Sequence, residues 1–239
     1  MWSVIPAAGK ATRLADSAGQ PCKALLEVGG RPILDWLLER LRDAVSDACL
    51  VVDRLDGSIR ETFDTKRHGI RLHYALQPEP LGVGEAVFRA AGLFGGPFAV
   101  VMGDVYYDQP LHGYIDKWRR SGADGAVLTE PLRSRPTDPI GLVRVTGESV
   151  ESVAKGTGAT EADQQLCGMA ILPESAFADA DVFRGSNSGS EIELESIITW
   201  LIEERGARFV SIPYRGWRRN INTVEDLEFV RAKVERHLG

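Results

Sequence analysis

The chain has 239 residues, of which 44% are apolar and 26% charged, and its formal net charge is −6. This composition excludes a disordered chain, a fibre or a disulfide-rich miniprotein. The acidic balance argues against nucleic acid or an anionic membrane as a partner. Because the sequence shows no repeats and no linker, we expect a single domain over residues 1–239.

The cysteines and the first residues indicate the compartment. Three widely spaced cysteines without a CxxC pair disfavour a disulfide framework or a zinc site and fit a reducing cytosol. The chain start lacks a basic region, and no apolar run approaches the roughly 20 residues of a membrane span. We therefore expect a cytoplasmic protein that has no membrane partner.

Short apolar runs alternate with amphipathic stretches, which is typical of βα units. Strands are predicted at 2–6, 48–52, 68–76, 98–102, 125–129, 142–145, 150–153, 167–172 and 209–212. Helices are predicted at 32–45, 84–91, 111–121, 194–204 and 223–237. The proline- and glycine-rich stretch 130–162 is interpreted as a hairpin and loop excursion that forms a lid or wall. The predicted class is α/β, a three-layer α/β/α Rossmann-like fold with a mixed, mainly parallel sheet.

A loop of small residues follows the first strand and reads Ala7-Ala8-Gly9-Lys10-Ala11-Thr12-Arg13. Small side chains let the backbone approach a ligand, and successive N–H groups can hold phosphate oxygens. Lys10 and Arg13 add the positive charge that a triphosphate needs. The spacing is neither a Walker loop nor GxGxxG, which disfavours a nicotinamide oxidoreductase. The alternative is a tight turn with incidental charges.

A proline-rich connection, Gln77-Pro78-Glu79-Pro80-Leu81-Gly82, precedes the second predicted helix. A glutamine amide presents an acceptor and a donor side by side, which matches the N3–H and O4 edge of uracil or thymine. A flipped amide would also accept cytosine. The alternative is a stiff connection without a ligand.

Gly103 and Asp104 follow the most apolar strand of the chain. Open α/β sheets bind ligands at the carboxyl ends of their strands, and carboxylate oxygens suit Mg²⁺. A helix-capping role for Asp104 is the alternative. Before the last helix the chain reads Trp217-Arg218-Arg219-Asn220-Ile221-Asn222-Thr223, and Thr223 with Asp226 predicts a capping box.

Together these segments resemble the sugar-phosphate nucleotidylyltransferase superfamily, which carries an AAGxGTR loop, a PK step, a GD step and a W-x-D-x-G-T-P-E-D-L ending. In this chain Ala11 stands at the second loop glycine, and Cys22 separates Pro21 from Lys23. The resemblance implies a GT-A-like fold and transfer of a nucleotidyl group, from UTP or dTTP by preference, to a sugar-like 1-phosphate with release of pyrophosphate.

The resemblance also implies roles for individual residues. Lys23 and Arg13 would contact the reacting phosphates and the pyrophosphate, and Asp104 would bind Mg²⁺ with Asn220 or, alternatively, Asn222. The implied nucleotide-binding set is Ala7, Ala8, Gly9, Lys10, Ala11, Thr12, Arg13, Gln77, Gly82 and Gly103.

For the acceptor, the resemblance points to Gly141, Lys155, Gly168 and Glu191. Ala154 and Ala170 replace a Glu and a Tyr of the family motifs, so we expect a differently shaped acceptor pocket. This keeps open a cytidylyl- or guanylyltransferase that acts on a non-hexose phosphate or phosphonate, and also a non-catalytic nucleotide-binding domain. The expected partners are a nucleoside triphosphate and a phosphorylated acceptor, and a homodimer is a possible assembly.

Overall fold

The computed structural model describes residues 1–9, 22–53, 57–132, 136, 138–158, 163–186 and 190–238. Four residues of the small-residue loop, Lys10, Ala11, Thr12 and Arg13, lie outside this part of the chain. Their expected contacts with phosphate therefore stay predictions.

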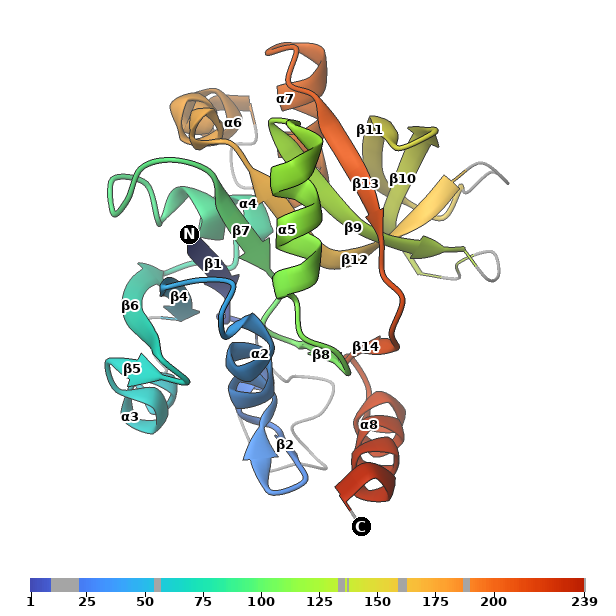
Figure 1. Cartoon of the computed structure of the whole chain (residues 1–239). Coiled ribbons are helices and arrows are strands. Elements are labelled where there is room, and N and C mark those ends of the chain that lie inside the picture. Colours follow the sequence, from blue (N-terminus) through green and yellow to red (C-terminus); the bar gives the residue numbers. More distant parts are fainter. Residues whose placement is uncertain are drawn as a thin grey trace.

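A ten-stranded mixed sheet forms the centre of the fold (Figure 1). In spatial order its strands are β10 (Ile140–Thr146), β11 (Ser149–Gly156), β13 (Phe209–Pro213), β9 (Gly125–Pro131), β12 (Asp163–Leu172), β7 (Phe98–Val101), β1 (Trp2–Pro6), β4 (Asp47–Asp53), β6 (Ile70–Gln77) and β5 (Lys66–Arg67). The pairings make β12, β11 and β5 run against all the others. The α/β class and the mixed, mainly parallel sheet are thus confirmed.

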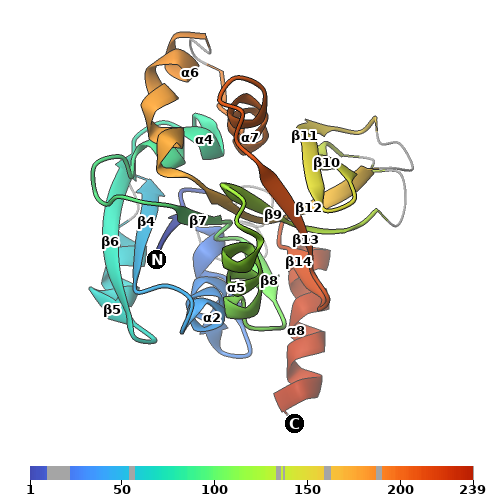
Figure 2. The same ribbon diagram turned by 45° about the horizontal axis from the view of Figure 1, so that its top comes forward.

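Helices cover both faces of this sheet (Figure 2). One face carries α2 (Ile33–Leu41), α3 (Ser58–Phe63) and α5 (His112–Ser121), and the other carries α4 (Gly82–Phe88), α6 (Ala180–Ser186) and α7 (Leu194–Glu203). Successive strand residues point to opposite faces, so Ile5 of β1 joins the first apolar cluster and Val4 the second. The predicted three layers are confirmed.

Several element ends differ from those that the sequence predicts. Helix α2 ends at Leu41 instead of residue 45, because Arg42 leaves the helical conformation and Asp43 has a φ of 66°. The predicted hairpin at 142–153 is antiparallel and longer than expected, and it continues the main sheet at one end. The short helices α3 and α6 were not predicted, because elements of six or seven residues carry little periodicity.

The last helix, α8 (Val224–Leu238), projects beyond the sheet in both ribbon views (Figures 1 and 2). It begins with the predicted capping box: the Asp226 N–H donates to Thr223 Oγ1 at 3.2 Å, and the Asp226 carboxylate accepts the Thr223 N–H at 2.9 Å. Its apolar face packs on Ile33 and Trp36 of α2. Among the described residues, none of the helices has the length and apolar character that a membrane span requires.

Short two-stranded ribbons complete the fold. β8 (Val105–Tyr107) pairs with β14 (Arg218–Asn220), and β2 (Glu27–Val28) pairs with β3 (Arg31–Pro32). A single turn of 3₁₀ helix at Lys23–Leu25 precedes β2, and a longer one at Glu174–Asp179 precedes α6. The β8–β14 ribbon brings the segment before α8 next to the strand that follows Asp104.

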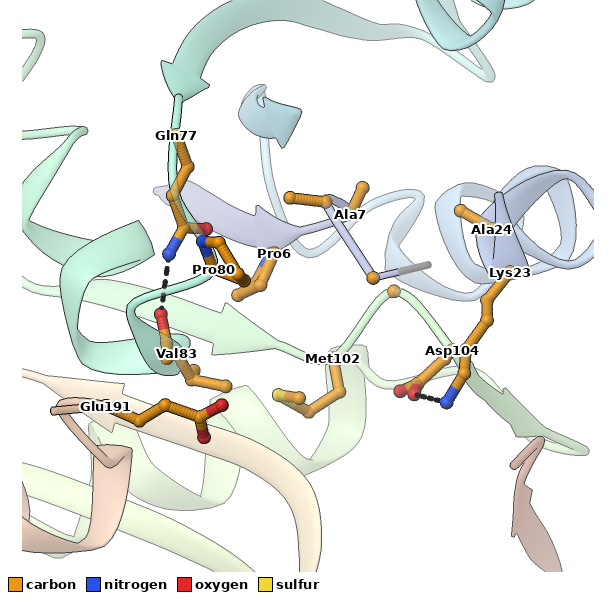
Figure 3. Close-up of a pocket in the computed structure, with 14 residues that line it drawn as sticks. Pro6, Ala7, Lys23, Ala24, Gln77, Pro80, Val83, Met102, Asp104 and Glu191 are labelled. Atoms are coloured by element: carbon orange, nitrogen blue, oxygen red, sulfur yellow. Dashed lines mark hydrogen bonds and ion pairs between the residues drawn. The ribbon is translucent and has the colours of Figure 1, made fainter. Parts of the chain in front are cut away.

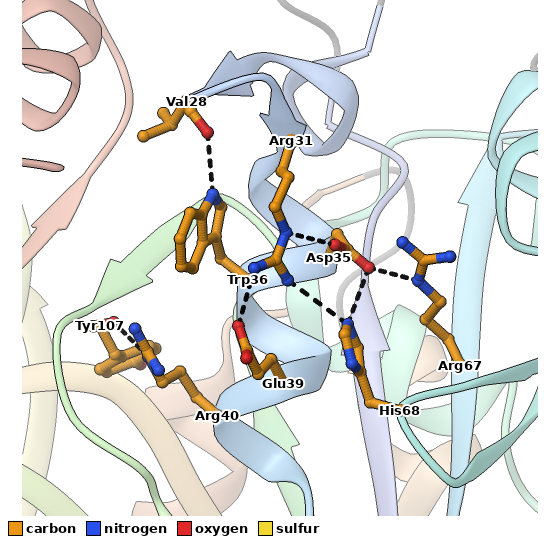
Figure 4. Close-up of polar contacts among 9 residues, drawn as sticks. All are labelled: Val28, Arg31, Asp35, Trp36, Glu39, Arg40, Arg67, His68 and Tyr107. Carbon is orange, nitrogen blue, oxygen red and sulfur yellow. Dashed lines mark hydrogen bonds and ion pairs between the residues drawn. The ribbon is translucent and has the colours of Figure 1, made fainter. Parts of the chain in front are cut away.

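A buried carboxylate connects α2 to the β5–β6 turn (Figure 4). Asp35 accepts hydrogen bonds from Arg31 Nε at 2.7 Å and Arg67 Nε at 2.5 Å, and His68 Nε2 lies 2.9 Å away. Arg31 also stacks on the Trp36 ring. Burial raises the pKa of Asp35, but Arg67, Arg31 and His68 outweigh it and lower the pKa from an ordinary 3.8 to about 2. Asp35 is therefore ionised in the folded chain at neutral pH.

Replacing this carboxylate will weaken the fold. We expect Asp35→Asn to lower the free energy of unfolding by about 1–2 kcal/mol, because it weakens charge-assisted hydrogen bonds to guanidinium groups that stay partly solvated. Since the folded pKa is depressed, the contribution is complete above about pH 4 and is lost as the pH falls toward 2. Urea unfolding between pH 2 and 7 measures both effects. The exposed Asp116→Asn is the control, and equal stability of the two variants at pH 7 would contradict the assignment.

Candidate active site

The carboxyl ends of β1, β4, β6 and β7 meet at one edge of the sheet, because these strands are parallel. Backbone hydrogen bonds connect the chain there: the Gly103 N–H donates to Pro6 O at 3.2 Å, and the Ala7 N–H donates to Val51 O at 2.8 Å. A cavity of about 170 Å³ opens at this edge (Figure 3). Its lining includes Ala7, Ala8, Gly9, Lys23, Gln77, Gly82, Gly103, Asp104 and Glu191.

Lys23 and Asp104 lie together at one end of this cavity (Figure 3). Lys23 Nζ donates to Asn222 Oδ1 at 2.7 Å and lies 3.5 Å from Asp104 Oδ2. The other oxygen of the carboxylate, Asp104 Oδ1, is buried and has no hydrogen-bond partner within the described residues. The Ile221 N–H donates to Asp104 O at 2.9 Å, which holds the segment that carries Asn222 in place.

These oxygens fit a divalent cation. Asp104 Oδ1 is a buried oxygen that has no hydrogen-bond partner within the described residues. Asn222 Oδ1 is a neutral oxygen that accepts a hydrogen bond from Lys23, whose ammonium group also lies next to Asp104. Carboxylate and amide oxygens are hard ligands of the kind that Mg²⁺ prefers. The described residues contain no group of three or more His, Cys, Asp or Glu side chains that would form a closed metal site. Water and ligand oxygens would therefore supply the remaining coordination, which is usual for Mg²⁺.

The two asparagines of the C-terminal segment have different surroundings. Asn220 Oδ1 accepts a hydrogen bond from Arg218 Nη1 at 2.5 Å. Arg218 is buried and also pairs with Glu130 at 2.7 Å. The oxygen of Asn220 is therefore engaged by a guanidinium group, whereas the oxygen of Asn222 contacts the ammonium group that Asp104 approaches.

Gln77 and Gly82 are in direct contact. Gln77 Nε2 donates to Gly82 O at 2.9 Å (Figure 3). Gly82 has a φ of 89°, and a Cβ there would lie 2.5 Å from Ile192 O. Ile192 is fixed by two further backbone bonds, from its N–H to Leu81 O and from the Gly84 N–H to Ile192 O. This packing places Glu191, expected near an acceptor, in the same cavity as Gln77.

A second cleft, of about 770 Å³, continues from Met102 and Asp104 toward the β10–β11 hairpin. Its lining includes the predicted Gly141, Lys155 and Gly168 together with Asn220 and Asn222. Gly168 has a φ of 73° and accepts the Met102 N–H at 2.9 Å, so it joins β12 to the end of β7. The predicted acceptor residues, apart from Glu191, thus share one cleft.

Sequence reasoning missed ion pairs that line this cleft. Glu193 forms an ion pair with Lys155, and Arg218 forms one with Glu130. The stretch from residue 191 to 195 alternates acidic and apolar residues, and this pattern does not reveal which glutamate faces a ligand. For Arg218 the strand-like pairing of β14 with β8 was the missing information.

Comparisons with known proteins identify the family of the chain. Residues 2–155 match the family model described as nucleotidyl transferase. The UTP–glucose-1-phosphate uridylyltransferase AglF of Haloferax volcanii is 26% identical over 238 residues, covering 98% of this chain and 97% of that protein. The bifunctional protein GlmU of Geobacter metallireducens is 30% identical over 256 residues, covering 99% of this chain but only 52% of that protein.

Solved structures share the fold. A putative glucose-1-phosphate thymidylyltransferase from Bacillus anthracis superposes with a TM-score of 0.85 at 17% identity, over 98% of this chain and 95% of that one. A UDP-glucose pyrophosphorylase complexed with UDP-glucose gives a TM-score of 0.84 at 18% identity, over 99% and 98% of the two chains. At these identities the likeness concerns the fold alone.

The contact between Gly82 and Ile192 yields a stability prediction with a matched control. Gly92 has a similar φ of 80°, but a Cβ there meets nothing within 4 Å. Both Gly→Ala variants carry the left-handed strain, and only Gly82→Ala adds a clash with backbone. We expect Gly82→Ala to lower the free energy of unfolding by about 1–3 kcal/mol more than Gly92→Ala does. Urea denaturation of both variants measures this difference. Equal losses of unfolding free energy would show that Ile192 yields to the added methyl group without cost.

Proposed function

Because the chain belongs to the nucleotidyl transferase family, we propose that it couples a nucleoside triphosphate, UTP or dTTP by preference, to a sugar-like 1-phosphate. The acceptor phosphate oxygen attacks the α-phosphorus, the bond to the β-phosphate breaks, and pyrophosphate leaves. The observation that carries the proposal is the position of Asp104, which lines both the cavity with Gln77 and the cleft with Lys155 and has the Lys23 ammonium group beside it. The uridylyltransferase relative supports the choice of UTP.

The small cavity and the larger cleft suit two phosphorylated substrates. The small cavity, with Gln77 and the start of the small-residue loop, would take the base and the triphosphate, and the larger cleft would take the acceptor. A sugar phosphate is already anionic near neutral pH, so attack requires no general base. Catalysis then consists of positioning and charge neutralisation. Lys23 supplies positive charge where the two phosphates meet, and Lys10 and Arg13 are proposed to face the leaving pyrophosphate.

We further propose dependence on Mg²⁺, held by Asp104 with Asn222 or Asn220. The ion would neutralise charge on the reacting phosphates. The buried, unpartnered Asp104 Oδ1 supports this assignment. Asn222 is favoured as the second ligand, because its side-chain oxygen contacts the same Lys23 ammonium group that lies next to Asp104.

Described residues of the stretch 130–162 line the larger cleft. Pro136, Asp138 and Gly141 line the larger cleft, and β10 and β11 extend the main sheet. We propose that this excursion is a wall of the acceptor site within one nucleotidyltransferase domain over residues 1–239.

Pyrophosphate release tests the reaction directly. The protein is incubated with Mg²⁺, one of the five common triphosphates, and a panel of sugar 1-phosphates and other phosphorylated acceptors. We expect release with UTP or dTTP, because the Gln77 amide complements the uracil and thymine edges. Release with GTP or ATP alone would contradict the base assignment and keep the chemistry. Triphosphate binding without release from any acceptor would favour a non-catalytic nucleotide-binding domain.

Asp104 gives the sharpest single substitution. We expect Asp104→Asn to lower kcat by at least about 100-fold, because it removes the carboxylate charge next to the reacting phosphates. The melting temperature should change little, since this side chain makes only the one long contact with Lys23 in the described structure. The exposed Asp181→Asn serves as the control. Full activity of Asp104→Asn, or failure of this variant to fold, would overturn the proposed role of Asp104 in catalysis.

A further inference from the structure

The larger cleft contains a carboxyl group, that of Glu195, which forms no ion pair within the described residues. Glu195 lies in the first turn of α7 and lines the cleft together with Gly141 of β10. A Cβ at Gly141 would come within 2.8 Å of Glu195 Oε1, so the carboxyl group rests directly against this glycine. Gly141 is thus the residue that makes room for Glu195.

The helix that carries Glu195 is fixed to the hairpin strand β11. Thr199, one turn after Glu195, donates its hydroxyl to Val153 O at 2.6 Å and accepts the Val153 N–H at 3.0 Å. These two hydrogen bonds set the position of α7 relative to the wall of the cleft. Glu195 therefore has a defined place beside the space that an acceptor would fill.

The charges around Glu195 leave it uncompensated. Its nearest charged neighbours, Glu193 and Lys155, form an ion pair with each other. Farther along the cleft Glu130 pairs with Arg218, and Asp226 pairs with Arg219. Within the described residues Glu195 has no ion pair, and its carboxylate is hydrogen-bonded only by its own backbone N–H. Burial, aided by the charge of Glu193, raises the pKa of Glu195.

A carboxyl group in a cleft wall loses water when a ligand enters, and this costs free energy unless the ligand donates a hydrogen bond. We infer that Glu195 is a specificity-determining residue that accepts a hydrogen bond from a hydroxyl or amino group of a sugar phosphate acceptor. The inference rests on the proposed function, and it deepens that function by requiring a donor group on the acceptor at the place of Glu195. An acceptor that presents only apolar or acceptor atoms there is discriminated against.

The experiment compares Glu195→Ala and Glu195→Gln with wild type, using glucose 1-phosphate and glucosamine 1-phosphate as probes. Acceptor KM and triphosphate KM come from pyrophosphate release, and direct binding of each probe comes from calorimetry. We expect Glu195→Ala to raise the acceptor KM about 10-fold or more, equivalent to about 1.4 kcal/mol, and to leave the triphosphate KM unchanged. Glu203→Gln, an exposed change on the same helix, is the matched control.

The Gln variant separates the two kinds of donor. A hydroxyl group still finds an acceptor oxygen in Gln, so Glu195→Gln should restore most of the affinity for glucose 1-phosphate. An ammonium group requires the charge, so the same variant should stay weak for glucosamine 1-phosphate. An unchanged acceptor KM and binding constant in a folded Glu195→Ala protein would overturn the inference.

Failure of the proposed function gives a different pattern. Wild-type turnover with other phosphorylated acceptors but neither sugar would overturn the role of Glu195 and leave nucleotidyl transfer standing. Absence of pyrophosphate release with every acceptor would refute the proposed function. In that case calorimetry still decides on Glu195, because equal probe binding by wild type and Glu195→Ala would count against it.

Discussion

The contact of Lys23 with Asp104 and Asn222 joins three segments that are far apart in the sequence, and the arrangement of the site depends on it. Lys23 comes from the turn after the small-residue loop, Asp104 from the end of β7, and Asn222 from the entry to α8. Backbone hydrogen bonds hold these segments: the Lys23 N–H donates to Gly9 O at 3.3 Å, and the Ile221 N–H donates to Asp104 O at 2.9 Å. The ammonium group is therefore held by the fold, next to the carboxylate that lines both the cavity and the larger cleft.

Helix α2 connects the segments that carry Lys23 and Asp104 through contacts outside the site (Figure 4). Trp36 of α2 donates its indole N–H to Val28 O at 2.9 Å, and Arg40 Nε donates to Tyr107 O at 3.1 Å. Helix α2 thereby connects the β2–β3 ribbon, which follows Lys23, to β8, which follows Asp104. The buried Asp35 then fixes α2 against the β5–β6 turn. Positioning of the reacting groups and stability of the fold thus draw on the same helix.

The sequence predicted what depends on local pattern and strand order. Parallel strands bring their carboxyl ends to one edge, and Gln77 and Asp104 line the same cavity there. The sequence left the choice between Asn220 and Asn222 open, and their different surroundings were not predictable, because they depend on Arg218, whose partner Glu130 lies 88 residues away in the chain. Glu195 escaped notice for a similar reason: its surroundings come from β10 and β11, and nothing near it in the sequence marks it.

An acidic protein has to bind substrates that are themselves polyanions, and the described structure shows how its positive charge is kept available. The cations of the larger cleft are paired with carboxylates of the same cleft, Lys155 with Glu193 and Arg218 with Glu130. Such pairs hold each cation in position without a ligand and limit nonspecific attraction of anions. A phosphate that enters competes with a carboxylate for the same donors, so affinity depends on geometry more than on net charge. Glu195, which has no ion pair within the described residues, adds a preference for hydrogen-bond donors. The cleft therefore favours a molecule that combines an anionic group with hydrogen-bond donors, and a sugar phosphate has both properties.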